Sequence, residues 1–322
     1  MKFDVSEMKT LNECGKKWQL SSRNAFHLKP KTANNNLFFG SLFHECLATM
    51  YLGGDLDKIV TQAVKECEGD PPMQRTIEKM LRGYYDEVLR EDLDNYIVLD
   101  IEKSVNIPLP ELQVFNDDGT LDEEKSIRVA GSVDMVALEK ETFEIWYFEH
   151  KTCSKFRPDV YFVLDEQPRT YFIDLISYVA MMNLRADEGK LPISFYQVLG
   201  LEVGAPLPEF RIGGVYINEV KKLSTKFEYM RRPCKYSDVQ VGRFYSTLVK
   251  TGQRLKALKE GRTTACASPG YMSCTMCDFA SICSTYGYED VELDELLEEF
   301  QEEFEVRTVD HLDEKAERKI EG

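Results

Sequence analysis

The chain contains no apolar run that approaches the roughly 18 residues needed to cross a bilayer. Its start, MKFDVSEMKT, has neither an apolar signal core nor a transit-peptide composition, so we expect an intracellular, cytoplasmic protein without a membrane partner. Internal repeats and low-complexity linkers are also absent, and nothing in the 322 residues forces a division into separate domains. A Gly-x-x-x-x-Gly-Lys-Ser/Thr phosphate loop is missing too, which means that any ATP-driven step would come from a partner protein.

The nine cysteines are an odd number, and in a reducing compartment they indicate metal or cluster ligation over a disulfide framework. Cys274, Cys277 and Cys283 form a compact set with the spacing Cys-x2-Cys-x5-Cys. Three thiolates are too few to close a tetrahedral site, so a fourth ligand comes from elsewhere, and Cys14 is the candidate. By spacing alone, Zn²⁺ and an iron–sulfur cluster fit about equally well. Cys266 is near enough to compete, and the remaining thiols are interpreted as buried or incidental: Cys46, Cys67, Cys153 and Cys234.

The net charge of −16 is unfavourable for binding a polyanion, but most of it belongs to residues 289–322, which carry 15 acidic and 4 basic residues. The first 288 residues therefore have a net charge of only −5. Within the tail, DELLEEFQEEFE has apolar residues at helical spacing, which predicts an amphipathic helix. This tail is either a solvated, partly disordered end or an arm that binds a partner or mimics DNA. Basic pairs elsewhere, Arg231-Arg232 among them, are candidates for contacts to a phosphate backbone.

Hydrophobic periodicity and turn signals divide the chain into helices and strands. Helices are predicted at about residues 6–20, 39–51, 73–92, 166–184 and 236–260. Strands are predicted at 97–109, in a hairpin over 131–151, and at 212–220. This order predicts an α/β fold in which helices flank a mixed sheet.

The hairpin, GSVDMVALEKETFEIWYFEHK, contains the first candidate site. Its apolar strands are joined by a polar turn at residues 140–142, so Asp134 at the end of one strand is expected beside Glu149 at the end of the next, at one edge of the sheet. Two carboxylates this close repel unless a divalent cation lies between them, and oxygen ligands suit Mg²⁺ or Mn²⁺. Lys151 follows Glu149 by two residues and shares its strand face. The set suits phosphodiester cleavage, whereas the simpler interpretation is a solvent-facing hairpin with hydrated carboxylates.

His44 lies on the predicted helix 39–51, whose other buried positions are all apolar. A lone histidine in such a position is commonly a core residue with its hydrogen bonds satisfied. It becomes a metal ligand if Asp134 and Glu149 face it, because imidazole, two carboxylates and the His150 carbonyl together suit Mn²⁺ or Mg²⁺. The residues alone leave both interpretations open.

Four short motifs occur in order: Gly-x-x-x-His at 40–44, Gly-x-x-Asp at 131–134, Glu-x-Lys at 149–151 and Gln-x-x-x-Tyr at 167–171. Together they resemble the RecB-type branch of the PD-(D/E)XK nuclease superfamily. Val133 stands where the family name has proline, a departure that the branch tolerates. The resemblance implies a restriction-endonuclease-like core with a helical N-terminal part and a C-terminal iron–sulfur segment.

The resemblance also implies a role for each matched residue. It assigns the metal ligands to His44, Asp134, Glu149 and the His150 carbonyl. Lys151 would orient or help deprotonate the attacking water and offset charge on the phosphate. Gln167 and Tyr171 would hold the DNA backbone or the Lys151 side chain, the alternative being a surface glutamine and a core tyrosine.

A second part of the resemblance concerns the cysteines. In the AddB subunit and the CRISPR-associated iron–sulfur exonucleases, one cysteine ahead of the nuclease motifs and three behind them bind a [4Fe-4S] cluster. This chain has a similar layout in Cys14, Cys274, Cys277 and Cys283. The resemblance therefore favours a cluster, with zinc as the alternative, and the cluster would tie together the ends of a very long loop.

We accordingly expect one iron–sulfur-stapled nuclease domain over residues 1–288 and an acidic tail over 289–322. Its parts are predicted as a core at about 95–220, helical parts at 1–92 and 236–265, and a cluster segment at 266–286. The implied activity is Mg²⁺- or Mn²⁺-dependent hydrolysis of DNA, as an exonuclease on single strands or DNA ends in recombination, repair or end processing. Helicase, recombinase or CRISPR-type proteins are the implied partners. The alternatives are a nuclease-like module that binds DNA or assembles a complex without cleavage, and a zinc protein of unrelated function.

Overall fold

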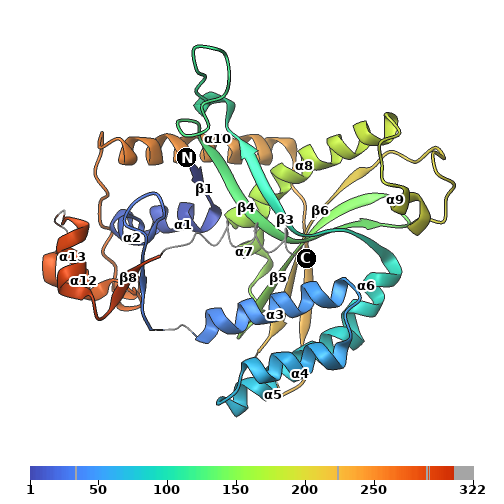
Figure 1. The fold of residues 1–322 in the computed structure, drawn as a ribbon, viewed down its shortest axis with the longest axis horizontal. Helices are drawn as coiled ribbons and strands as arrows, with labels where there is room; N and C mark the ends of the chain where they lie inside the picture. Colours follow the sequence, from blue (N-terminus) through green and yellow to red (C-terminus); the bar gives the residue numbers. More distant parts are fainter. Residues whose placement is uncertain (33–34, 223–224, 288, 290, 308–322) are drawn as a thin grey trace. The chain divides into compact units, whose positions relative to one another are not determined.

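The computed structural model describes residues 1–32, 35–222, 225–287, 289 and 291–307 (Figure 1). Its contacts divide into two compact units, each assembled from separate stretches of the chain. The first unit combines Met1–Ala33, Asn106–Gly131 and Gly242–Gly322. The second combines Asn34–Val105 and Ser132–Val241. A single stapled domain over residues 1–288 stays a prediction.

The second unit contains most of a mixed β-sheet. Strand β4 (Arg128–Glu139) pairs antiparallel with β5 (Glu144–Cys153), as the predicted hairpin requires. β5 pairs in parallel with β6 (Arg211–Lys221), which pairs antiparallel with β7 (Tyr229–Cys234), a strand missing from the sequence prediction. β3 (Tyr96–Pro108) also pairs with β4. The α/β fold with a mixed sheet flanked by helices is therefore confirmed.

Helices cover both faces of this sheet, because successive strand residues point to opposite sides. Helices α3 (Asn35–Tyr51), α4 (Leu56–Glu66) and α5 (Pro71–Tyr84) share a buried cluster with sheet residues such as Met135, Trp146 and Phe148. Helix α8 (Glu166–Asp187) packs on β5 and β6, where its Asp174 accepts a 2.7 Å hydrogen bond from Tyr147. Shorter segments complete this unit: η1 (Tyr85–Leu89), α6 (Arg90–Asn95), α7 (Asp159–Leu164) and α9 (Ile193–Val198).

The first unit begins with two helices where one was predicted. The sequence pattern favours a single helix over 6–20, but the chain forms α1 (Val5–Glu13) and α2 (Gly15–Ser21). They are separated by Cys14, which has an extended backbone and whose N–H donates to the Thr10 carbonyl at the end of α1. Sequence periodicity cannot detect a one-residue break of this kind. Other elements of the unit are β1 (Lys2–Phe3), β2 (Leu28–Pro30), η2 (Pro110–Leu112), most of α10 (Asp238–Lys259), α11 (Tyr271–Thr275) and α12 (Ala280–Tyr286).

The beginning of the acidic tail is part of this first unit. Residues Leu293–Phe300 form α13, as the amphipathic pattern predicts, and Phe304–Val306 form β8, which pairs antiparallel with β2. Leu296, Phe300 and Phe304 are buried in a cluster with Leu20, Leu28, Phe279 and Ile282. The interpretation as a solvated end is therefore wrong for this stretch, because its apolar face has a partner. Residues 308–322 lie outside the described part of the chain.

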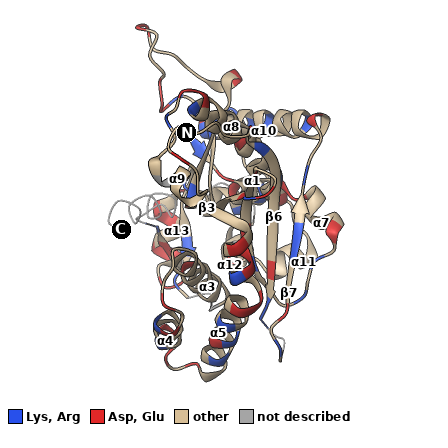
Figure 2. Cartoon of the chain, turned by 90° about the vertical axis from the view of Figure 1, so that its right-hand side faces the viewer, with Lys and Arg blue, Asp and Glu red and all other residues tan. Residues whose placement is uncertain are grey.

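No helix among the described residues is both long and apolar enough to span a membrane. Acidic and basic residues both occur along helices such as α4 and α5 (Figure 2).

Substituting Phe300 with alanine tests whether the tail contributes to the folded unit. Phe300 is buried, and truncating such a side chain removes transfer free energy and leaves a cavity, so we expect a loss of about 3–5 kcal/mol in the free energy of unfolding. Urea unfolding of the full chain measures it. The control Glu298→Ala changes an exposed side chain of the same helix and is expected within about 0.5 kcal/mol of wild type. If both variants were equally stable, the interpretation of the tail as a solvated end would be correct.

Candidate active site and cysteine cavity

The register between β4 and β5 brings two carboxylates face to face. Met135 is opposite Phe148, so continuing the antiparallel ladder by one residue sets Asp134 opposite Glu149. Neither residue is at a strand end, because β4 continues to Glu139 and β5 to Cys153. The predicted position at the edge of the sheet is therefore wrong, since β4 and β5 are both paired on two sides. Both side chains are nearly covered, with 11% of the Asp134 side chain and 5% of the Glu149 side chain exposed.

Asp134 is held by two histidines. His44, on α3, places Nδ1 3.3 Å from Asp134 Oδ1, and the His150 backbone N–H donates to Oδ2 at 2.7 Å. Burial opposes ionisation of Asp134, yet the His44 imidazole and His150 hold its pKa below the usual value. Burial alone would lower the pKa of His44, but the Asp134 and Glu149 carboxylates outweigh it and raise that pKa. The predicted helix position of His44 thus faces the carboxylates, as its role as a ligand requires.

Glu149 is contacted by a cation and an amide. The Lys151 ammonium forms an ion pair with Glu149 Oε1, and Gln167 Nε2 donates to the same oxygen at 2.8 Å. Burial, then the charge of Asp134, raise the pKa of Glu149 against the opposing effect of Lys151. Its other oxygen, Oε2, is buried and has no hydrogen-bond partner among the described residues. A buried carboxylate oxygen left in this state is costly, and a ligand role for it would remove that cost.

Gln167 and Tyr171 connect α8 to the two site strands. Gln167 Nε2 is 2.9 Å from the Tyr171 hydroxyl, and that hydroxyl donates to the Ser132 carbonyl at 2.7 Å. The sequence prediction assigned this pair to the DNA backbone or the Lys151 side chain, whereas the contact of Gln167 is to Glu149. Because Asp165 accepts a hydrogen bond from the Gln167 N–H at the beginning of α8, the glutamine is positioned by the helix start.

The side chain of His150 points away from the two carboxylates, into the face covered by α3 and α5. Its Nδ1 lies 3.3 Å from Asn218 Nδ2 and 3.5 Å from the Tyr84 hydroxyl, and its ring stacks on Tyr51. Burial lowers the pKa of His150 to about 3, so the ring is neutral at neutral pH. In an extended strand the N–H and C=O of one residue point to the same side, so the His150 carbonyl faces β4 and Asp134.

Sequence analysis missed the polar residues behind His150. Arg231 on β7 forms a bidentate pair with Asp92 at 2.6 and 2.7 Å and donates to Asn218 at 2.9 Å. Arg232 pairs with the buried Glu219 and with Asp159. The interpretation of Arg231-Arg232 as a phosphate contact is therefore unsupported for these side chains, since their guanidinium groups are engaged inside the fold. These contacts depend on the pairing of β6 with β7, and no local sequence motif predicts them.

The donor set fits a hard divalent cation: two carboxylates, one imidazole and a strand carbonyl, with one carboxylate oxygen lacking a protein partner. In the structure the cationic partners of the carboxylates are His44 and Lys151. Across the described ranges, no group of three or more His, Cys, Asp or Glu side chains is already arranged around a common point for a metal ion. Binding would therefore require small side-chain rotations at residues that are otherwise in contact.

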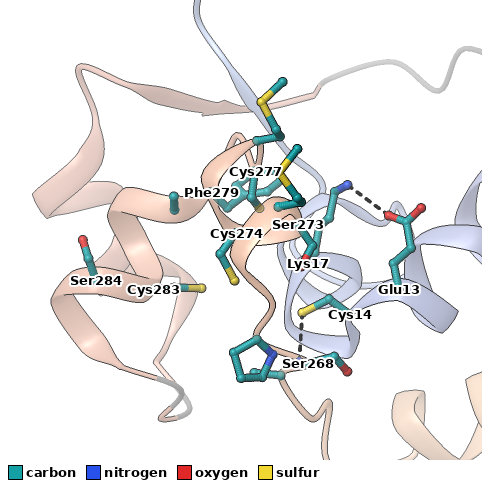
Figure 3. Close-up of a pocket in the computed structure, with 15 residues that line it drawn as sticks. Glu13, Cys14, Lys17, Ser268, Ser273, Cys274, Cys277, Phe279, Cys283 and Ser284 are labelled. Atoms are coloured by element: carbon teal, nitrogen blue, oxygen red, sulfur yellow. Dashed lines mark hydrogen bonds and ion pairs between the residues drawn. The ribbon is translucent and has the colours of Figure 1, made fainter.

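The four predicted cysteine ligands line one cavity of the first unit. Cys14, Cys274, Cys277 and Cys283 all border a space of about 510 Å³. Figure 3 shows the sulfurs of Cys14, Cys274 and Cys283 turned toward that space. The Ser268 N–H donates to Cys14 Sγ at 3.5 Å and the Gly270 N–H to Cys274 Sγ at 3.4 Å. All nine cysteines of the chain are free thiols.

Gly15 allows the two distant cysteine segments to meet. A Cβ added at residue 15 would lie 2.6 Å from the Cys266 carbonyl oxygen and 2.9 Å from the Cys266 nitrogen. Backbone atoms cannot move aside as a flexible side chain can, so only glycine permits this approach. Cys14 is thereby held beside the segment that contains Cys274, whereas Cys266 itself is absent from the residues that line the cavity.

The PD-(D/E)XK nuclease superfamily model matches residues 2–284. The chain belongs to this superfamily. Its members are metal-dependent phosphodiesterases that act on nucleic acids, and the mixed sheet flanked by helices is consistent with their fold. Among solved structures, "Crystal structure of SSO0001" shares 11% identity over 88% of this chain and 85% of that one, with a TM-score of 0.31, which is too low to bear on function. No curated protein matches.

Because His150 is neutral in the folded protein, we expect the free energy of unfolding to depend on pH. Between about pH 3 and its ordinary pKa of 6.5, the unfolded chain binds a proton at His150 that the folded chain does not. Lowering the pH therefore favours unfolding, by up to about 1.4 kcal/mol per pH unit for this group. Urea unfolding in EDTA at pH 6.5, 5.5 and 4.5 should show wild type losing stability more steeply than His150→Asn. Parallel curves would mean that His150 is charged when folded.

Proposed function

We propose that the chain is a Mg²⁺- or Mn²⁺-dependent deoxyribonuclease of the RecB-type, iron–sulfur branch. The observation that carries the proposal is the convergence around Glu149 of residues from four separate motifs. These residues come from a helix, two paired strands and a second helix: His44, Asp134, Glu149, Lys151, Gln167 and Tyr171. A structural ion-pair cluster has no need for two nearly buried carboxylates on adjoining strands, because their mutual repulsion costs stability.

The metal would be held by His44, Asp134, Glu149 and the His150 carbonyl. Bound there, it would lower the pKa of water and neutralise charge on the phosphoryl oxygens. The two histidines contact Asp134, and the Lys151 ammonium with the Gln167 amide contacts Glu149. The protein therefore orients both carboxylates before substrate binds.

Lys151 supplies the second function of the site. Its ammonium already lies against Glu149, so it can turn toward a phosphate oxygen or toward the attacking water without leaving the site. Burial alone would lower its pKa, but Glu149 and Asp134 outweigh this and raise it, which keeps the side chain cationic at neutral pH. A fixed positive charge of this kind stabilises the charge that accumulates on phosphorus-bound oxygens during displacement.

Single strands or free DNA ends are the proposed substrate, in recombination, repair or end processing. This preference rests on the resemblance of the ordered motifs to the RecB-type branch. A helicase, recombinase or CRISPR-type protein is the proposed partner, since the sequence contains no phosphate loop for unwinding. The alternative is a module that binds DNA or assembles a complex with little or no cleavage.

Glu149→Gln and Lys151→Ala separate these alternatives. Glu149→Gln removes a negative charge proposed to hold the metal, and Lys151→Ala removes the positive charge proposed to act on the phosphate. We therefore expect the rate of Mn²⁺-dependent cleavage of a labelled single-stranded oligonucleotide to fall by at least about 100-fold in each variant. Glu144→Gln is the matched control, because Glu144 is on the same strand with a surface partner, Lys235. Equal residual cleavage in wild type and both site variants would favour the binding module.

The cysteine cavity is proposed to hold a [4Fe-4S] cluster. Four thiols from the two ends of the chain border one space, and backbone N–H groups donate to two of the sulfurs, an arrangement that tunes iron–sulfur centres. Tying residue 14 to residues 274–283 closes a very long loop and would stabilise the fold on the order of 5 kcal/mol.

Cys277→Ala tests the cluster. We expect loss of the brown colour and of the broad absorbance at about 400 nm, with a larger effect on solubility and stability than on cleavage per folded molecule. Iron content, absorbance and thermal unfolding measure this. Cys266→Ala, an exposed thiol outside the cavity lining, should retain wild-type colour and stability. If the wild-type protein is colourless and contains zinc, the site holds Zn²⁺ and not a cluster. If Cys277→Ala is as stable as wild type, the proposed stabilising link between residue 14 and residues 274–283 is wrong.

A further inference from the structure

Helix α7 exposes apolar side chains in the unit that contains the candidate active site. Of its six residues, only Phe162 is buried, whereas Val160, Tyr161, Val163 and Leu164 are 61%, 41%, 45% and 61% exposed. Single exposed apolar residues are ordinary, but four on six consecutive positions indicate a surface that receives a ligand.

The helix is a fixed surface and not a loose loop. The Phe162 ring is covered by two guanidinium groups, Arg157 at 4.9 Å and Arg232 at 5.2 Å from its centroid. Arg157 and Arg232 both pair with the fully buried Glu219. The backbone carbonyls are also tied down, with Tyr236 donating to Phe162 O at 3.1 Å and Arg169 donating to Val163 O at 3.0 Å. The exposed side chains are therefore held outward by contacts on the opposite side.

The position of α7 couples it to the reacting groups. Asp165 ends α7 and begins α8, the helix whose Gln167 holds Glu149. At its other end, α7 follows Lys151 by only a short connector. The Asp165 carboxylate interacts electrostatically with Lys151. Both ends of α7 are therefore linked to Lys151, the residue proposed to contact the phosphate.

We propose that α7 binds the bases of an unpaired DNA strand next to the cleaved phosphate, with the Tyr161 ring as the stacking surface. This inference rests on the proposed nuclease function. The Arg157 guanidinium lies 5.0 Å from the Tyr161 centroid, and Lys155 and Arg169 are the nearby residues that supply positive charge for the adjoining phosphates. Asp159, the acidic residue of the helix, is neutralised by Arg232 at 2.6 Å.

The chemistry of the surface favours unpaired bases over other ligands. In a duplex the base faces are stacked inside, so an aromatic ring flanked by aliphatic side chains can contact them only in a single strand. A stable protein interface covers about 800 Å² per partner, which four side chains on a six-residue helix do not supply. The site would thus select single strands or frayed ends by contact with their bases.

The test is binding of a fluorescein-labelled 20-nucleotide single strand and of the matched duplex to the full chain by fluorescence anisotropy in EDTA. Without divalent metal, binding is measured independently of cleavage. Stacking on one aromatic residue contributes enough that Tyr161→Ala should weaken single-strand binding about tenfold, with little change for the duplex. Tyr161→Phe keeps the ring and should retain wild-type affinity. Phe115→Ala, an exposed aromatic in the other unit, is the matched control and should also bind as wild type.

A second measurement does not depend on how a variant folds. Ultraviolet crosslinking of wild type to a strand containing 5-iododeoxyuridine should attach the nucleotide to a peptide that contains Tyr161. Unchanged anisotropy for Tyr161→Ala, or crosslinks only outside residues 155–169, would overturn the proposal. If light scattering gives a smaller mass for Tyr161→Ala than for wild type while DNA binding is unchanged, α7 is a protein interface and the proposal is wrong. If wild type binds single strands through Tyr161 but no metal supports cleavage, the nuclease proposal fails while this inference stands.

Discussion

The antiparallel register of β4 and β5 is the constraint on which the rest of the site depends. It sets Asp134 opposite Glu149 on one face of the sheet, with almost no solvent access to either side chain. Two such carboxylates repel strongly in a medium of low dielectric constant. Groups from neighbouring elements reduce this repulsion. They are the His44 imidazole from α3, the Lys151 ammonium from β5 and the Gln167 amide from α8. His44 and Lys151 already balance the two negative charges, and a divalent cation bound by the carboxylates would do the same.

Strand alternation gives the site a second layer on the opposite face. Because His150 follows Glu149, its backbone N–H serves Asp134 while its side chain enters the core formed by α3 and α5. There the neutral ring meets Asn218 and the Tyr84 hydroxyl, and Asn218 in turn accepts from Arg231. Each polar group has a partner in this network, so the strand segment that presents Glu149 and Lys151 has little freedom to shift. Arg231 of β7, which the sequence suggests as a phosphate contact, takes part in this network instead.

In the first unit, segments from near the two ends of the chain lie in contact. Gly15 permits backbone contact with the segment at Cys266, and this approach sets Cys14 among the later cysteines. The acidic tail contributes to the same unit, because the apolar side of α13 and the strand β8 cover Leu20, Leu28 and Phe279. The acidic residues of α13 itself are exposed on its outward side. The net charge of the whole chain therefore says little about the charge around the candidate active site.

The sequence by itself determined the residue types of the site, their order and most elements, since helix periodicity and strand composition are local properties. It correctly gave the hairpin turn, the helix of His44 and the helix of Gln167 and Tyr171. It did not give the break at Cys14, the strand β7 or the burial of Arg231, because each depends on a distant partner. Tertiary structure alone decided that Gln167 contacts Glu149, that Glu149 keeps an unpartnered oxygen, and that α7 faces outward. These are contacts between segments far apart in the chain, and local sequence carries no record of which surface each segment meets.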